Sequence, residues 1–165
     1  MTLFLAGNWA MPTTAAATAV ATGTSIKTML QIAPPSTRPI RVVKWGVSFT
    51  AAPTAAVTCE LIQTDVAATV TAHSASGVQP YDSTQGTPVS AVTLGTSATG
   101  FTASAEGSTT ATRYGDLQVI PAGVSQLTWE WSLGREFMVA PSTFLRVRMT
   151  TTVTVNALTY CIWAE

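Results

Sequence analysis

The chain is poor in charge: only 10% of its 165 residues are Asp, Glu, Lys or Arg, against about a quarter in an average soluble domain. Eight basic and eight acidic side chains give a net charge of zero. The densest basic set, Arg38, Arg41 and Lys44, is too sparse to neutralise a run of phosphates. We therefore expect no nucleic-acid binding, and we expect other protein to cover much of this weakly charged surface.

Residues that commonly carry catalysis or bind metals are also scarce. His73 is the only histidine, and we expect it to be an exposed loop residue, because its stretch is rich in Ser and Ala and has no nearby cysteine. The carboxylates are scattered, and neither a nucleophile elbow nor a phosphate-binding loop is present. There are two catalytic alternatives. One is a Ser-His-Asp set that includes His73, and the other is a pair of carboxylates that meet across the fold. The sequence predicts no enzyme, no metal site and no cofactor.

The chain also has few cysteines and no long apolar run. Cys59 and Cys161 are the only two cysteines, and each lies in a predicted strand, so we expect two buried thiols, with one disulfide as the alternative. No apolar run approaches the ~20 residues of a membrane-spanning helix, and we expect no contact with a membrane. Residues 1–23 contain no Lys or Arg and are interrupted by Pro12, unlike a secretory signal peptide.

What the chain does have is alternation with a period of two, most clearly in its last forty residues. From Leu127 onward the apolar side chains fall on one side and Thr128, Glu130 and Ser132 on the other, and residues 145–155 alternate in the same way, as half-buried strands do. Six residues are predicted for the core: Trp45, Leu127, Trp129, Trp131, Leu145 and Val147. Sugar binding by the aromatic residues is the alternative, and it is less favoured because the tryptophans share a face with leucines.

About eight such segments follow one another, with turn residues every eight to twelve positions and no convincing helical face. This pattern predicts an all-β fold, an antiparallel β-sandwich, with a jelly roll as the first choice and a barrel as the alternative. The domain is expected to span residues 26–165. The clearest strands are expected at 26–32, 40–50, 57–64, 127–133, 145–155 and 158–163, and weaker ones at 89–94, 99–104 and 114–120.

Two segments without clear periodicity are the candidate contact regions. Residues 1–25 are expected to form an extended N-terminal arm that docks on a neighbouring subunit, although folding back onto the same domain is equally compatible with the sequence. The proposed anchors of this arm are Leu3, Phe4, Leu5 and Trp9. Residues 66–90 are expected to form a long loop, with Tyr81 and Asp82 as its candidate contact residues. A further expectation places Glu130 opposite Arg146 and Arg148 on paired strands.

The C-terminal pattern resembles a known group of proteins. The segment W-E-W-S-L-G-R-E-F, followed by V-A-P-S-T-F-L-R-V-R and a Thr/Val strand that ends in Y-C-I-W-A-E, is similar to the C-terminal hairpins of tailed-bacteriophage head proteins, in particular small capsid decoration, or cement, proteins. The resemblance implies a β-sandwich that forms oligomers, often homotrimers, and binds symmetry axes or subunit junctions on the outside of the shell. It implies no individual contact residues, because no shared motif marks them.

The leading hypothesis is therefore a structural virion protein that binds the outer surface of a phage head, assembled in the host cytoplasm, and stabilises it by bridging major-capsid subunits. Its partners would be the major capsid protein and copies of itself. One alternative is a tail-tip or fibre module that binds a host surface glycan through Tyr81 and Asp82. Another is a shell-forming jelly-roll coat protein, which is less favoured because residues 1–25 carry no basic residue to neutralise packaged nucleic acid.

Overall fold

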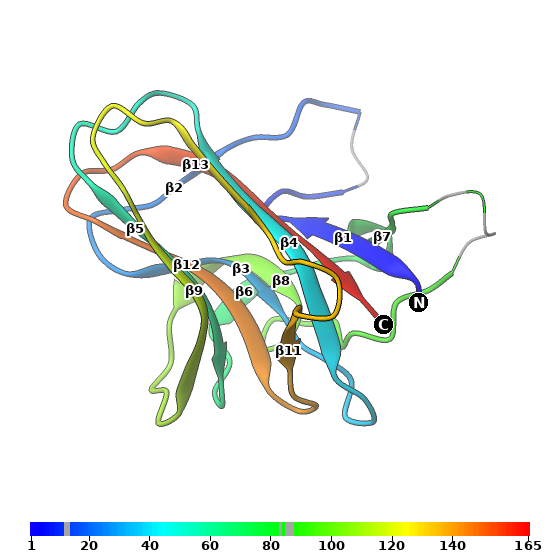
Figure 1. Cartoon of the computed structure of the whole chain (residues 1–165). Helices are drawn as coiled ribbons and strands as arrows, with labels where there is room; N and C mark the ends of the chain where they lie inside the picture. Colours follow the sequence, from blue (N-terminus) through cyan, green and yellow to red (C-terminus); the bar gives the residue numbers. More distant parts are fainter. Residues whose placement is uncertain (12–13, 83, 85–87) are drawn as a thin grey trace.

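The computed structural model describes residues 1–11, 14–82, 84 and 88–165, and these residues form an all-β protein of two antiparallel sheets packed face to face (Figure 1). The N and C termini lie side by side at one end of the molecule (Figure 1) because the first long strand pairs with the last, with Leu3 opposite Ala164. The predicted antiparallel β-sandwich is confirmed.

Sheet A holds the two ends of the chain. Its spatial order is β10 (Gln126–Glu130), β4 (Ile40–Phe49), β13 (Asn156–Ala164), β1 (Leu3–Gly7) and β7 (Gln79–Pro80). Two further short strands extend it: β11 (Phe137–Val139) pairs with β4, and β2 (Val20–Ala21) pairs with β13. The strand β13 is therefore a central strand, with neighbours on both sides.

Sheet B covers the other face of the core. Its order is β6 (Thr69–Ala72), β8 (Gly100–Ala105), β3 (Lys27–Ile32), β12 (Phe144–Thr151), β5 (Val57–Thr64) and β9 (Thr112–Ile120). A single 3₁₀ turn, η1 (Ala75–Gly77), lies between β6 and β7. Residues 89–94, expected as a weak strand, instead make only isolated bridges, from Thr93 to Ala33 and from Leu94 to Thr99.

The core lies between the sheets and contains two fully buried tryptophans, Trp45 and Trp163. Leu145 and Val147, which alternate inward along β12 as their spacing predicts, are also buried there. The rings of Phe4 and Trp163 lie 6.2 Å apart between centroids. Burial of such large apolar side chains, at roughly 25 cal/mol per Å² removed from water, is the main source of stability in a domain of this kind.

A β-bulge at Val43 changes the buried face of β4. The pairing of β4 with β13 shifts register at this point, where Ile162 is opposite Lys44 and Trp163 opposite Val42. An extra residue on one strand moves the following side chains to the other face. For this reason Ile40 and Val42 are buried before the bulge. Strict alternation from Trp45 would place Arg41 and Val43 on the core face, but Arg41 is exposed and Val43 only half-buried.

Candidate functional site

The side of the sandwich where β9 faces β10 and β11 is the most distinctive surface of the protein, and we call it the open side. Here β9 ends sheet B, while β10 and β11 follow each other along the outer edge of β4 in sheet A. Strands at an edge carry unpaired backbone groups and only part of the cover that a central strand receives. Apolar side chains on these strands are therefore left partly in contact with water.

Contacts between side chains join the two sheets along the open side. The indole Nε1 of Trp45 on β4 donates a hydrogen bond to Asp116 on β9, at 3.1 Å. The guanidinium of Arg113 on β9 lies 4.6 Å from the ring centroid of Phe137 on β11. That ring also packs against Gly115, where a Cβ atom would lie only 2.5 Å from it. These contacts hold β9 against β4 and β11.

Exposed apolar side chains are concentrated on this side. Seven of the twelve large hydrophobic side chains that are exposed among the described residues belong to β9, β10, β11 and the segments between them. Leu133 is the most exposed, at 87%, and Val119 is 61% exposed. The seven are Tyr114, Leu117, Val119, Val124, Trp129, Leu133 and Met138. All seven lie within 25 consecutive residues, 114–138, and exposed apolar side chains that form a contiguous patch are typical of protein-contact surfaces.

The expectation that Trp129 belongs to the core is wrong, although its predicted face is right. Trp129 pairs with Trp45 across β10 and β4, so both side chains lie on the same face of sheet A. Because β10 is the edge strand, Trp129 remains 45% exposed. Its neighbours Leu127 and Trp131 are partly buried against the core. Alternation therefore identifies the inner face of a strand, but it does not show whether the opposing sheet reaches that far.

The sequence did contain a signal for the contact residues on β9. In this strand Ile120 points inward beside Val57, whereas Leu117 and Val119 lie on the opposite face beside Glu60 and Thr58. Apolar residues on both faces of one strand indicate either a central, doubly covered strand or an edge strand whose outer face meets a partner. The extended segment expected at residues 114–120 is therefore confirmed as part of β9, but its position at the edge of a sheet was not predicted.

The predicted arm begins as part of the domain. Residues 3–7 form β1, which pairs with β13 on one side and β7 on the other. Phe4 is buried at 2% exposure, and Leu3 and Leu5 are half-buried. Of the two alternatives for these residues, the structure therefore shows folding back onto the same domain. Trp9 is also half-buried, and its ring lies over Gly7. A boundary at residue 25 therefore does not separate an arm from the sandwich.

The candidate loop residues Tyr81 and Asp82 are exposed and follow β7 directly. The backbone N–H of Tyr81 donates to the carbonyl of Leu3 at 2.8 Å. Asp82 accepts hydrogen bonds from the N–H and hydroxyl of Thr84, which lowers the pKa of its carboxyl below the usual range. Further along, the N–H of Ala91 donates to the Glu165 carboxylate at 2.8 Å. The described parts of this loop are thus tied to sheet A at both ends.

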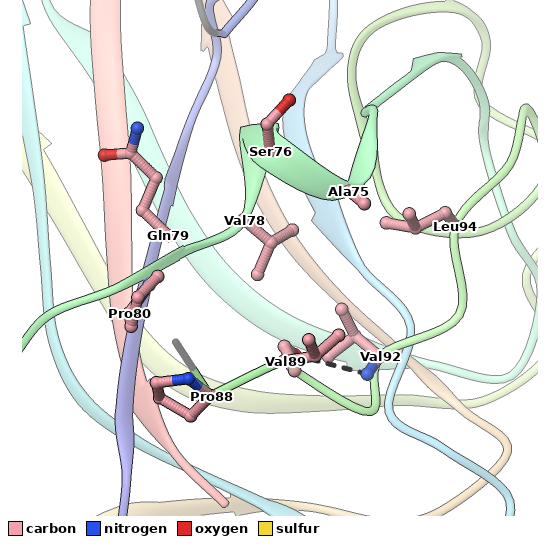
Figure 2. Close-up of a pocket in the computed structure, with 10 residues that line it drawn as sticks. Ala75, Ser76, Val78, Gln79, Pro80, Pro88, Val89, Val92 and Leu94 are labelled. Carbon is pink, nitrogen blue, oxygen red and sulfur yellow. Dashed lines mark hydrogen bonds between the residues drawn. The ribbon is translucent and has the colours of Figure 1, made fainter. Parts of the chain in front are cut away.

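A hollow of about 460 Å³ lies between residues 75–80 and 88–94, beside β7 (Figure 2). Figure 2 shows Val78, Val92 and Leu94 pointing into this space, whereas the polar ends of Gln79 and Ser76 point away from it. Its volume is within the range of small-molecule pockets, but such pockets also present convergent polar groups that orient a ligand. The other lining residues are Ala75, Pro80, Pro88, Val89 and Ser90, so the lining is mostly apolar.

His73 is not the exposed loop residue that its surroundings predicted. Its side chain is buried at 4% exposure, with Nε2 2.9 Å from the carbonyl oxygen of Gly7 and its ring centroid 4.8 Å from that of Phe101. None of the contacts described for this imidazole is with a carboxylate, so they contain no Ser-His-Asp arrangement. Among the described residues, no three His, Cys, Asp or Glu side chains gather where they could hold a metal ion.

Both cysteines are free, buried thiols in the core, as the first of the two alternatives predicted. Cys59 lies on β5 of sheet B and Cys161 on β13 of sheet A. Burial raises the pKa of the Cys59 thiol to about 12, with a smaller contribution from Glu60, and burial also raises the pKa of Cys161. Thiols with such high pKa values are neutral and unreactive in the folded protein.

The expected pairing of Glu130 with Arg146 and Arg148 is wrong, because these residues lie on different sheets. Glu130 on β10 forms an ion pair with Lys44 on β4, at 3.3 Å. Arg148 on β12 pairs with Glu60 on β5, at 3.1 Å. The strands β10 and β12 are close in sequence, but they lie in different sheets and do not pair.

Comparisons of the chain with protein families, curated proteins and solved structures found no match. In the part of the chain that the structure describes, no helix has the length and apolar character required to cross a membrane.

Proposed function

We propose that this chain is a non-enzymatic structural protein of a virion, which binds the outside of a phage head and stabilises it by bridging major-capsid subunits. It acts as a homotrimer on the outer surface of the head, assembled in the host cytoplasm. Many modest contacts, made at once by several copies, give such a protein its avidity without a single strong site.

The observation that carries this proposal is the concentration of exposed apolar side chains on the open side. Leu117 and Val119 project from an edge strand whose outer backbone edge has no partner among the described strands. Monomeric soluble proteins rarely leave a long edge strand with exposed apolar residues, because it promotes association. A surface of this kind is suited to contact with another protein and offers no chemistry for catalysis.

The strand order supports the jelly-roll part of the proposal. When β1, β3, β4, β5, β9, β10, β12 and β13 are numbered one to eight, sheet A has the order 1-8-3-6 and sheet B the order 2-7-4-5. In this order consecutive strands alternate between sheets for most of the chain, as in the two interlocked Greek keys of a jelly roll. Jelly rolls occur in many shell-forming and shell-binding proteins, so the fold alone favours no single function.

The placement of basic residues also supports a partner other than nucleic acid. Six of the eight basic side chains are already engaged within the domain, among them Arg146 with Glu106 and Arg148 with Glu60. The remaining four of these six engaged side chains are Lys27, Arg38, Lys44 and Arg113. A protein that binds nucleic acid normally leaves clustered Lys and Arg side chains free to reach phosphates.

The experiment that tests the proposal is co-sedimentation of the purified protein with expanded phage heads assembled without it. We expect the wild-type protein to sediment with the heads and to raise their resistance to heat. Val119→Lys on the open side is expected to lose both effects, whereas the matched change Thr152→Lys, on an exposed turn outside the open side, is expected to retain them. Failure of the wild-type protein to bind, or equal binding by both variants, would contradict the proposal.

A second candidate function is binding of a host surface glycan by a tail-tip or fibre module. The observation in its favour is the exposed Tyr81, which follows β7 close to the apolar hollow. An exposed aromatic ring offers a face on which a sugar stacks. Binding on a glycan array that is lost in Tyr81→Ala, together with no binding to heads, would favour this function over the first.

A further inference from the structure

The buried histidine joins two parts of the chain that are far apart in sequence. His73 follows β6, and its Nε2 lies 2.9 Å from the carbonyl oxygen of Gly7, the last residue of β1. Because a carbonyl oxygen only accepts hydrogen bonds, Nε2 must carry the hydrogen, and Nδ1 of the neutral ring is then the unprotonated nitrogen. The next residue makes a parallel contact, since the Ser74 hydroxyl donates to the carbonyl of Met11 at 2.9 Å.

The other ring nitrogen has no place for a proton. Nδ1 is buried and has no hydrogen-bond partner among the described residues. It faces the backbone of Gly77 in η1 so closely that a Cβ atom there would lie 2.5 Å from it. A proton on Nδ1 would therefore be a buried donor without an acceptor, and it would give the ring a positive charge.

The surroundings of the ring provide no charge to compensate. The contacts described for it come from Gly7 at the end of β1, Phe101 on β8 and Gly77 in η1, and none of these side chains is titratable or charged. The N–H of His73 donates to the backbone oxygen of Thr99, which is likewise uncharged. Burial lowers the pKa of His73, and the hydrogen bond to Gly7 opposes this shift only in part.

We propose that His73 is a pH-sensitive latch, which in its neutral form closes the contact between the end of β1 and the β6–β7 connection and which opens when the ring is protonated. Opening breaks the contact at Gly7 and frees the neighbouring Ser74 contact at Met11. It also moves η1, whose Ala75 forms part of the wall of the apolar hollow beside β7. The latch thus links acidification to the shape of that hollow and to the anchoring of the N-terminal residues.

The direction of the effect follows from the lowered pKa. Above about pH 6.5, the ordinary pKa of histidine, the ring is neutral in both the open and closed forms and the latch is fully stable. As the pH falls below this value, the open form binds a proton first, and the equilibrium constant for opening rises about tenfold per pH unit until the pKa of the closed form is reached. The latch is therefore lost on acidification and is insensitive to pH changes above 7.

The test uses the fact that His73 is the only histidine in the chain. NMR of the imidazole gives its pKa and tautomer without any assignment problem, and hydrogen exchange gives protection factors for the amides of His73 and Gly77. We expect a pKa below 6.5, a hydrogen on Nε2 at neutral pH, and protection factors at these amides that fall about twofold or more between pH 7 and pH 5, by a larger factor the lower the pKa of the imidazole. The amide of Val147 in the core is expected to change much less.

The matched variant is His73→Gln, whose amide donates to Gly7 but does not titrate in this range. In this variant the protection factors at residues 73 and 77 are expected to be lower than in the wild-type protein and independent of pH between 5 and 7. A pKa at or above 6.5 in the wild-type protein, or an equal fall in protection in both proteins, would overturn the proposal. If the variant does not fold, the titration and tautomer of the wild-type imidazole still decide.

Discussion

Arg146 illustrates how single residues hold the loops of this domain against the sheets. Its side chain projects from the outer face of β12 and is fully buried, beneath the connection that crosses sheet B from β5 to β6. The guanidinium donates to the carbonyl oxygens of Glu106, at 2.9 Å, and Val66, and lies 3.4 Å from the Glu106 carboxylate. Burial lowers the pKa of Arg146, and Glu106 partly opposes this effect. One charged residue therefore fastens two separate connections.

Replacement of Arg146 is expected to be costly. Arg146→Ala leaves the Glu106 carboxylate and two carbonyl groups without their donor, and we expect the free energy of unfolding to fall by about 3–5 kcal/mol. Lys44→Ala is the control, since Lys44 makes a partly exposed ion pair with Glu130, and such pairs contribute about 0–1 kcal/mol. Denaturation in urea measures both, and equal losses would contradict the structural role of Arg146.

Asp65 is expected to contribute to stability in acid. It accepts hydrogen bonds from the hydroxyl and N–H of Thr110 and from the N–H of Ala111, which hold the pKa of its carboxyl at about 2. Because this value is below that of the unfolded chain, the contribution is complete above about pH 4 and is lost as the pH falls toward 2. Urea denaturation at pH 4.5 and pH 2 should show a smaller loss in Asp65→Asn than in the wild-type protein. An identical loss in both proteins would exclude this role for the carboxylate.

Residue roles that depend on distant segments were beyond the reach of the sequence. His73 lies in a stretch of Ser, Ala and Gly that is typical of exposed loops, and contacts with the end of β1, with Phe101 on β8 and with η1 bury it. Arg146 alternates with buried apolar residues, so its pattern predicted an exposed position on the wet face of a strand. In both cases a segment from elsewhere in the chain covers the side chain. The local periodicity of a sequence does not show which distant segment will pack on a residue.

At the scale of the strands, alternation identified the core-facing residues of two central strands, although it failed at the bulge of the central strand β4. The segments expected at 57–64 and 145–155 correspond to β5 and to β12, which ends at Thr151. Alternate residues of both strands, such as Cys59 and Val147, lie in the core, but Ile62 and Arg146 on the opposite faces are buried as well. The shorter strands β1, β2 and β11 were not predicted, because they contain two to five residues and are stabilised by pairing with β13 and β4. Whether such short strands form depends more on pairing with a distant strand than on their own composition.

The strand β1 provides a test of whether the N-terminal residues belong to the sandwich. Phe4 is 2% exposed and packs on Trp163, so Phe4→Ala is expected to lower the free energy of unfolding by about 3–5 kcal/mol. Met1→Ala serves as the control, because Met1 is exposed and lies just outside the strand. Thermal denaturation that showed the same small change in both variants would mean that β1 is dispensable, as an arm for a neighbouring subunit would be.

At the scale of the whole molecule, the two sheets differ in how their edges are protected. Near the β7 edge of sheet A, Tyr81 is hydrogen-bonded to Leu3 of β1 and the loop that follows is tied to Glu165 through Ala91. At the open side, β9 ends sheet B with Leu117 and Val119 exposed. Charge is one common protection for such an edge, and the chain has little of it, so we propose that association with another chain covers this surface.

The mass of the protein in solution tests this account most directly. We predict that light scattering coupled to gel filtration at micromolar concentration gives three times the 17.2 kDa of one chain, and that Val119→Lys shifts the protein toward a single chain while Thr152→Lys does not. Both variants add the same charge, so a difference between them reports on the open side. A wild-type protein with the mass of one chain, or a Val119→Lys variant that remains fully associated, would contradict the claim that the open side is a subunit contact.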